Sequence, residues 1–251
     1  MVLEAYIDGS GGGTETLVLA GYVAPAEKWA SFSIAWEKAL GGIKAKSFKA
    51  SKMRNQPQKS ENFYRIIEDT VFLAFSCIVN KQDIEDAVKS IDWPVFIKNH
   101  DKLANPYYFS FKALVNVLLQ HAEPLKIDQR VNFYFDNQTE KLRTIDTWEI
   151  LKDSSSPDVT ALMGGLNYGD EEELLPLQAG DFYAYWVRRW AIEGNSNGVA
   201  NLEFPWKPNR DIPRLHMTFT KDDLIKELSK GLDDPVIIQR ALLRSEERFS
   251  S

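Results

Sequence analysis

The stretch Leu3-Glu4-Ala5-Tyr6-Ile7-Asp8-Gly9-Ser10 opens the chain with an apolar run that ends in an aspartate followed by glycine. The run Leu3–Ile7 predicts a short strand, and the glycine-rich residues 9–13 predict a turn. A second apolar, β-rich run over Thr16–Val23 completes a hairpin. We therefore expect the chain to begin as part of a sheet, with Asp8 at the end of its first strand.

The same pattern returns in Val131-Asn132-Phe133-Tyr134-Phe135-Asp136, a strongly apolar run that again ends in an aspartate. Helix-like segments separate the two runs, and strands alternating with helices indicate an α/β sheet. In such sheets ligands bind beyond the carboxyl ends of the strands. Asp8 and Asp136 would meet there if their strands are parallel neighbours.

A third aspartate lies on a long helix predicted over Leu177–Ile192, with Pro176 as its first residue. Gln178 precedes Asp181 by three positions, so the two side chains share a face of this helix. Gly180 offers a small surface that would let the helix lie close against a sheet. Because burying a lone carboxylate is costly, Asp181 needs a partner, which would be a cation, a metal or an arginine.

Three aspartates from two strand ends and one helix are typical of sites for Mg²⁺ or Mn²⁺, which prefer oxygen ligands. Two such ions ~4 Å apart would activate a water and stabilise the leaving oxygen of a phosphodiester. Each aspartate also has a structural interpretation. Asp8 would form a turn before glycine, Asp136 would cap the next helix, and Asp181 would pair with an arginine.

Five short segments, taken in their order along the chain, resemble the bacterial and phage proteins grouped as domain of unknown function 3800. The segments are Tyr6–Gly11, Leu19–Val23, Tyr107–Lys112, Phe133–Asp136 and Leu177–Tyr185. The resemblance implies a ribonuclease H-like fold, a mixed central sheet flanked by helices. It also implies that the acidic residues of the family correspond to Asp8, Asp136 and Asp181.

The chain departs from that family pattern at three positions. Gly9 stands where a glutamate is common, Lys49 where a histidine is frequent, and Gly180 where an alanine is usual. The departure at Gly9 removes one possible ligand, and a protonated Lys49 could not bind a metal. Candidates for a fourth acid are Glu4, Asp170 and Glu149.

The 251 residues, 44% hydrophobic and 26% charged, have ordinary globular composition. We expect one ribonuclease H-like domain over residues 1–251, with a core of about 3–192 and a C-terminal extension, 193–251, that carries a charged helical segment at 221–248. Cys77 is the only cysteine and lies in an apolar run, so it is expected to be a core residue. Without a signal peptide or a membrane-spanning stretch, we expect a cytoplasmic protein and no membrane partner.

The net charge of −6 argues against broad, salt-driven coating of nucleic acid, which needs a basic surface. Residues 44–54 form a local basic stretch with no acid among them. Lys49 and Lys52 in this stretch are candidate contacts to a substrate phosphate. The alternative interpretation is a solvated loop.

Two functional hypotheses follow. The first is a Mg²⁺- or Mn²⁺-dependent phosphodiesterase or nuclease, with Asp8, Asp136 and Asp181 as metal ligands and catalytic residues. Gln178 would support the site or contact the substrate, which would be DNA, RNA or another phosphodiester. The second is a catalytically inactive binding or regulatory module in a phage-defence or mobile-element setting. A lysine or arginine paired into the acidic cluster would favour this second hypothesis.

Overall fold

The computed structural model describes residues 2–11, 15–95, 97, 105–137, 141–193 and 203–233. In this part of the chain six strands form one sheet, in the order β5-β4-β1-β2-β3-β6. The strands are β1 (Leu3–Ser10), β2 (Thr16–Pro25), β3 (Leu73–Asn80), β4 (Val131–Asp136), β5 (Met163–Gly169) and β6 (Arg214–Phe219). β2 runs antiparallel to its neighbours β1 and β3, whereas β4 runs parallel to β1 and to β5, and β6 runs parallel to β3.

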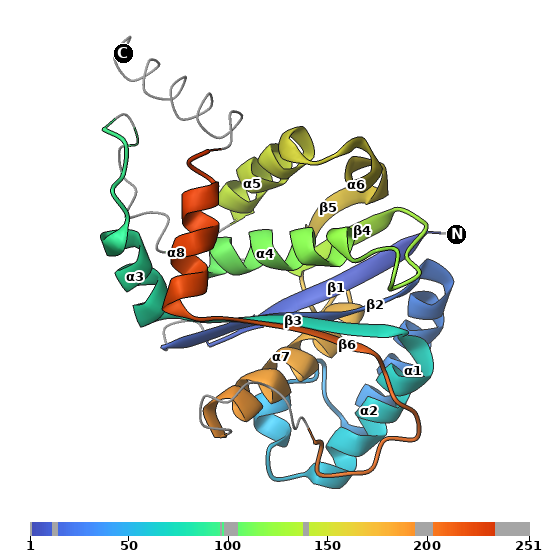
Figure 1. Cartoon of the computed structure of the whole chain (residues 1–251). Coiled ribbons are helices and arrows are strands. Elements are labelled where there is room, and N and C mark those ends of the chain that lie inside the picture. The colour runs from blue at the N-terminus through green and yellow to red at the C-terminus, as the bar shows by residue number, and fades with distance from the viewer. Residues whose placement is uncertain are drawn as a thin grey trace, which may run out of the picture.

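Helices cover both faces of this sheet (Figure 1). One face carries α3 (Lys81–Ser90), α4 (Pro106–Gln120), α5 (Lys141–Ser154) and α8 (Lys221–Lys230), with the short α6 (Pro157–Leu162) beside β5. The other face carries α1 (Ala26–Ile43), α2 (Pro57–Thr70) and α7 (Pro176–Glu193), with the 3-10 turn η1 (Ala50–Met53) between α1 and α2 in the chain. The expected α/β class, a mixed central sheet flanked by helices, is confirmed. No helix among the described residues is both long and apolar enough to cross a membrane.

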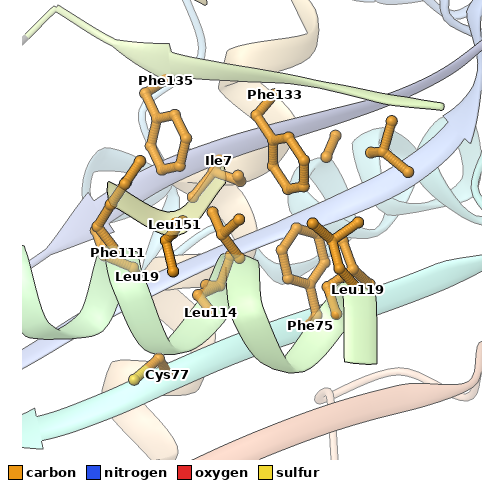
Figure 2. Packing of buried hydrophobic residues seen from close by; sticks show 14 of the residues in the cluster. Ile7, Leu19, Phe75, Cys77, Phe111, Leu114, Leu119, Phe133, Phe135 and Leu151 are labelled. Carbon is orange, nitrogen blue, oxygen red and sulfur yellow. The ribbon is translucent and has the colours of Figure 1, made fainter. Parts of the chain in front are cut away.

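Alternate side chains of the central strands point to opposite faces of the sheet and belong to two separate hydrophobic cores. Ile7 of β1 joins a cluster under α4, whereas its neighbour Tyr6 joins an aromatic cluster under α1 and α7. Figure 2 shows the first cluster, in which Phe111 packs against Phe135. A strand that is buried on both faces needs apolar residues at nearly every position. This requirement explains the apolar run in β1, whereas β4 alternates buried and partly buried positions.

Cys77 lies on β3 inside the first cluster and is fully buried (Figure 2). Burial raises the pKa of its thiol to about 12. Because the thiolate is the reactive form of cysteine, this side chain is inert at neutral pH. Its expected role as a small core residue is confirmed.

The chain after residue 203 differs from the expectation of an outer, helical extension. Arg214–Phe219 forms β6 and pairs with β3, and its alternate residues Leu215, Met217 and Phe219 pack against the first core cluster. The predicted helix beyond the strand begins at Lys221 and ends at Lys230, and the remainder of the prediction, residues 234–248, lies outside the described residues. Six residues with alternating polarity make a half-buried edge strand, a weaker pattern than a continuous apolar run.

Glu68 holds the segment before β6 against the end of α2. Its fully buried carboxylate accepts hydrogen bonds from the backbone N–H groups of Asn209 (2.5 Å) and Arg210 (2.9 Å) and forms an ion pair with Arg65 (2.9 Å). The Arg210 side chain in turn donates to the backbone oxygens of Glu68 and Val71. These contacts direct the chain toward the free edge of β3.

Helix α1 ends in an unusual way. It continues through the glycine pair Gly41-Gly42 to Ile43. Lys44 then adopts the left-handed conformation (φ 55°), and its N–H bonds to the carbonyl oxygens of Gly41 and Leu40. A residue in this conformation is a common way to end a helix, and here a lysine takes the position that glycine usually holds.

Candidate active site

The register of β1 and β4 brings the first two aspartates together. Tyr6 pairs with Tyr134 and Ile7 pairs with Phe135 in this parallel ladder, so the next residues along the two strands are Asp8 and Asp136. Side chains alternate between the faces of a strand, so Asp8 lies on the same face as Tyr6. That face packs against α7. The expected meeting of Asp8 and Asp136 at the carboxyl ends of parallel neighbours is therefore observed.

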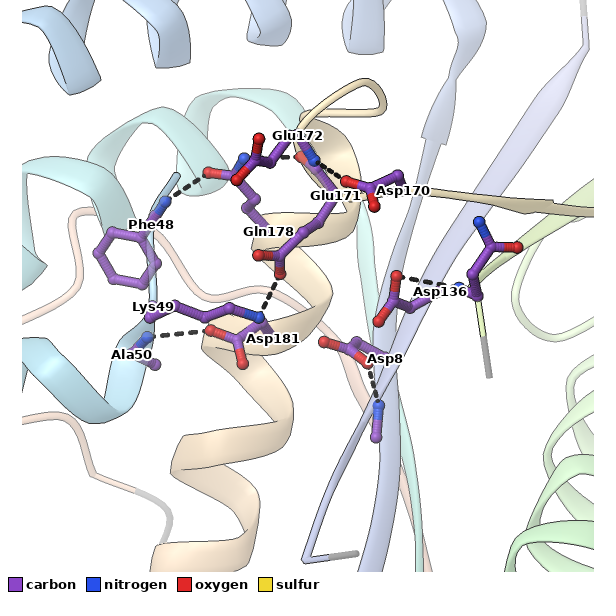
Figure 3. Close-up of polar contacts among 12 residues, drawn as sticks. Asp8, Phe48, Lys49, Ala50, Asp136, Asp170, Glu171, Glu172, Gln178 and Asp181 are labelled. Carbon is purple, nitrogen blue, oxygen red and sulfur yellow. Dashed lines mark hydrogen bonds and ion pairs between the residues drawn. The ribbon is translucent and has the colours of Figure 1, made fainter. Parts of the chain in front are cut away.

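Helix α7 brings the third aspartate to the same place. The helix lies against β1 at Gly180, where a Cβ atom would be 2.9 Å from the backbone nitrogen of Asp8. Asp181, the next residue, therefore lies beside Asp8, and Figure 3 shows the carboxylates of Asp8, Asp136 and Asp181 facing one region. The close approach predicted for Gly180 is confirmed.

A backbone N–H group holds one oxygen of each of these carboxylates. Oδ1 of Asp8 accepts from Gly9 N (2.6 Å), and Oδ1 of Asp136 accepts from Asn137 N (2.9 Å). Oδ2 of Asp181 accepts from Ala50 N (2.9 Å). The second oxygen of each aspartate accepts no hydrogen bond from the described residues.

Burial and mutual repulsion disfavour negative charge at this cluster. Burial, followed by the charge of Asp181, raises the pKa of Asp8 to about 8. Burial is also the main cause that raises the pKa of Asp136 and of Asp181, and the charge of Glu171 contributes to both. A cation at this position would relieve the repulsion and favour the ionised carboxylates.

Glu171, in the turn between β5 and α7, is the fourth acid of the cluster, and its carboxylate forms an ion pair with the Lys49 ammonium group (Figure 3). Burial alone would lower the pKa of Lys49, but the hydrogen bond to Glu171 and the charge of Asp181 raise it overall. Lys49 was predicted as a phosphate contact. The structure shows its ammonium group among the acids instead, and a phosphate contact stays a prediction.

The sequence did not single out Glu171 among the consecutive acids of residues 170–173. Its signal was its place two residues after the end of β5, where Gly169 pairs with Asp136. Of the earlier candidates, Asp170 lies near enough to Asp136 to raise its pKa. Glu149 pairs with Lys152 on the surface of α5.

The third candidate, Glu4, belongs to a different part of β1. Its carboxylate accepts hydrogen bonds from the hydroxyl groups of Tyr6 (3.2 Å) and Tyr134 (3.3 Å). Asp8 is four positions further along the strand than Glu4, a distance of about 13 Å at ~3.3 Å per residue. Glu4 is therefore not a ligand of the same site.

Gln178 is fully buried and ties three segments together. Its Oε1 accepts from Trp36 Nε1 (2.8 Å) and from Phe48 N (2.8 Å), while its Nε2 donates to the backbone oxygen of Glu171 (2.7 Å). These contacts occupy the amide, so Gln178 holds the segments that carry Lys49 and Glu171 against α7. Of the two roles expected for Gln178, the geometry agrees with support of the site.

Lys52, the other predicted phosphate contact, lies exposed on η1, two residues after Ala50. Lys44, Lys46 and Arg54 of the same basic stretch are exposed as well. This stretch begins at the end of α1 and passes the acidic cluster at Lys49. Positive charge is thus available next to the cluster for a polyanionic ligand.

The chemistry of the cluster fits a hard divalent cation, because every donor is a carboxylate oxygen. As they stand, however, no three acids, histidines or cysteines among the described residues are grouped closely enough to hold a metal ion. Metal binding would therefore require the side chains to move inward. The ion pair of Lys49 with Glu171 is the contact that such a movement would have to change first.

The chain matches no protein-family model and no curated protein. Its structure is similar to a chain in the solved "Structure of the PCNA:RNase HII complex from Archaeoglobus fulgidus". The similarity covers 94% of this chain and 92% of that chain, with 13% sequence identity and a TM-score of 0.42. A likeness at this level assigns no activity, so the function is argued from the geometry of the site.

Proposed function

We propose that the protein is a Mg²⁺- or Mn²⁺-dependent phosphodiesterase or nuclease, acting on DNA, RNA or another phosphodiester. The observation that carries this proposal is the shared arrangement of Asp8, Asp136 and Asp181. Each carboxylate has one oxygen held by a backbone N–H group and a second oxygen that accepts no hydrogen bond from the described residues. Carboxylates with one oxygen held by the backbone and the other free would bind a hard cation once the side chains move inward.

Several features of the surroundings support this chemistry. A bound divalent ion would act as a Lewis acid: it would polarise a phosphoryl oxygen and lower the pKa of a bound water. Gln178 would keep the segments around the ion in place, and Lys52 would bind a substrate phosphate. We also propose membership of the domain of unknown function 3800 family, since the three aspartates of its motifs meet in space.

A non-catalytic binding or regulatory module is the second candidate. The observation that favours it is the ion pair between Lys49 and Glu171, which brings a cationic side chain into the acidic cluster. In this case Lys49 would serve as the internal counter-ion of the cluster, and the protein would bind no metal. Gly9, at the position where the resembling family often has glutamate, is in line with such a loss of activity.

Calorimetric titration with Mn²⁺ on the wild type, Asp136→Asn and Glu149→Gln distinguishes the two candidates. Glu149 is the control, because its carboxylate is exposed on α5 and pairs only with Lys152 among the described residues. The metal-dependent proposal expects binding by the wild type and by Glu149→Gln, and its loss in Asp136→Asn. A folded wild type that binds no Mn²⁺, with or without a nonhydrolysable oligonucleotide, would favour the second candidate.

Cleavage assays then test the activity itself. Fluorescently labelled single- and double-stranded DNA and RNA are incubated with Mg²⁺ or Mn²⁺, and with EDTA as the metal-free control. The proposal expects cleavage that EDTA and Asp136→Asn both abolish and that Glu149→Gln leaves unchanged. Cleavage that persists in EDTA would contradict metal dependence.

A further inference from the structure

We infer that the exposed cations on either side of Lys49 form a docking surface for the phosphate backbone of a nucleic acid. Between Glu37 and Glu61 the chain carries seven lysines and arginines and no acid. We name as the basic strip the exposed cations that follow the end of α1, which are Lys44, Lys46, Lys52, Arg54 and Lys59. The inference rests on the proposed function and deepens it, because it names the surface that would hold the substrate and the chemical class of that substrate.

Backbone hydrogen bonds hold the basic strip in a defined shape. Lys44 ends α1 in the left-handed conformation (φ 55°), and its N–H bonds to carbonyl oxygens of the last helical turn. Further along the strip, the N–H of Lys52 donates to the backbone oxygen of Lys49 (3.0 Å), within the segment that forms η1. The cations therefore extend from fixed backbone positions, which a freely moving loop would not provide.

The middle of the strip is anchored to α7 beside the acidic cluster. The N–H of Ala50 donates to Oδ2 of Asp181 (2.9 Å), and Figure 3 shows this segment next to that aspartate. Lys46 and Lys52 are each three residues from Lys49, so their backbones lie within about 11 Å of it at ~3.6 Å per residue. A phosphate backbone bound along the strip would therefore pass the acidic cluster.

The positive charge of the strip is not neutralised within the protein. None of its five cations forms an ion pair with another residue in the described part of the chain, whereas Lys49 pairs with Glu171. A cation that neutralises a phosphate releases counterions condensed on the nucleic acid, and this release favours binding at low salt. On a chain with a net charge of −6, a local cluster of unpaired cations directs a polyanion to one place.

The uncharged side chains around the strip favour a nucleic acid over a membrane or an acidic protein. Ser51, Asn55 and Gln58 are exposed among the cations, and side chains of these types donate hydrogen bonds to phosphates. No large apolar side chain is exposed among residues 41–60, all of which the structure describes. A membrane-binding surface needs apolar residues that enter the bilayer, and protein interfaces are enriched in aromatic residues and depleted in lysine. Phosphate contacts do not read bases, so we expect binding with little sequence preference.

Fluorescence anisotropy of a labelled oligonucleotide of mixed sequence measures the binding, with EDTA present so that no divalent metal contributes. The strip variant carries Lys44→Gln, Lys46→Gln and Lys52→Gln. The control variant removes three exposed lysines far from η1 in the chain, through Lys89→Gln, Lys126→Gln and Lys226→Gln. Each variant loses three cations, so the two have the same net charge. A third variant, with arginine in place of Lys44, Lys46 and Lys52, keeps the charge of the strip.

The wild type, the control variant and the arginine variant are expected to bind with similar affinity. The strip variant is expected to bind about tenfold more weakly, or worse, at ~100 mM salt. The slope of log Kd against log salt concentration should also fall by about 2–3 in the strip variant, because each lost phosphate contact removes about 0.7–0.9. Single- and double-stranded DNA and RNA are compared in the same way.

Equal weakening in the strip and control variants would overturn the inference, because net charge and not the strip would then govern binding. A wild type that binds no oligonucleotide would overturn it as well, and so would binding to phosphatidylserine vesicles in place of oligonucleotides. The proposed activity is judged separately by cleavage. Binding through the strip without cleavage in any metal would leave the inference standing and remove the activity. Cleavage by a strip variant that binds as well as the wild type would do the reverse.

Discussion

A Cβ atom on Gly180 would lie 2.9 Å from the backbone nitrogen of Asp8 and 3.3 Å from its Cβ atom. Helix α7 and strand β1 therefore touch through a position that has room for hydrogen only. The contact connects local packing with the site, because the residue after Gly180 is Asp181. The family resemblance led us to regard alanine as the usual residue here, but in this chain alanine would collide with backbone.

Gly180→Ala is expected to destabilise the protein by roughly 1–3 kcal/mol, the usual range for overpacking a close contact. The colliding atoms belong to the backbone of β1, so relief requires α7 and Asp181 to move away from Asp8. Urea denaturation measures the loss of stability, and Mn²⁺ titration measures the expected weakening of metal binding. Gly42→Ala is the control, because a Cβ there meets nothing within 4 Å, and it should be stabilising by roughly 0.5–1 kcal/mol. Equal effects of the two substitutions would contradict the close contact.

Asp8→Asn is expected to stabilise the metal-free protein at neutral pH. Burial and the charge of Asp181 raise the pKa of Asp8 from 3.8 to about 8, so the folded state holds a proton that the unfolded state has lost. The free energy of unfolding therefore falls as the pH rises from about 4 to about 8, and the substitution removes this fall. At about 1.4 kcal/mol per pH unit, the gain at pH 7 is at most about 4 kcal/mol.

The measurement for Asp8 is the difference between urea-denaturation curves of the wild type and Asp8→Asn from pH 4 to pH 8, with EDTA present. Taking the difference isolates Asp8 from other titrating groups. The two proteins should have similar stability near pH 4 and diverge as the pH rises. A difference that does not depend on pH would show that the pKa of Asp8 is unshifted.

Gln178→Met is expected to cost about 2–4 kcal/mol, because it removes partners from two buried N–H groups and one partly buried carbonyl. Trp36 Nε1, Phe48 N and the backbone oxygen of Glu171 would all lose their hydrogen bonds to the amide. Urea denaturation gives the cost, and amide hydrogen exchange at Phe48 and Ala50 should report a loosened segment around Lys49. Gln82→Met is the matched control, since Gln82 is exposed on α3 and its loss should change stability by less than about 0.5 kcal/mol.

Glu68→Ala tests what holds the segment before β6 in place. It leaves two backbone N–H groups and Arg65 without their buried acceptor, and the expected cost is about 2–4 kcal/mol. Glu61→Ala removes the second, partly exposed carboxylate that pairs with Arg65 and should cost less than about 1 kcal/mol. Chemical denaturation compares the two variants. A similar cost for both would mean that the Glu68 contacts to Asn209 and Arg210 add nothing.

Local pattern was enough to recognise the elements that build the site. β1 is buried at most positions and β4 at alternate positions, so both were visible as apolar runs; β4 ends at Asp136 as expected, whereas β1 continues past Asp8 to Ser10. Pro176 marked the start of α7, and the small residue Gly180 indicated the close packing that places Asp181. Strand β6 was missed because an edge strand buries only one face.

The sequence by itself determined which residues form these strands and helices, since the spacing of apolar residues along the chain reflects which face of each element is buried. Only the tertiary structure decided which distant side chains meet. Lys49 and Glu171 are 122 residues apart, and Glu68 and Arg210 are 142 apart. Such ion pairs and hydrogen bonds depend on strand register and on the contact distance between α7 and β1. No spacing along the chain encodes them, because their geometry exists only after the sheet and its helices have packed.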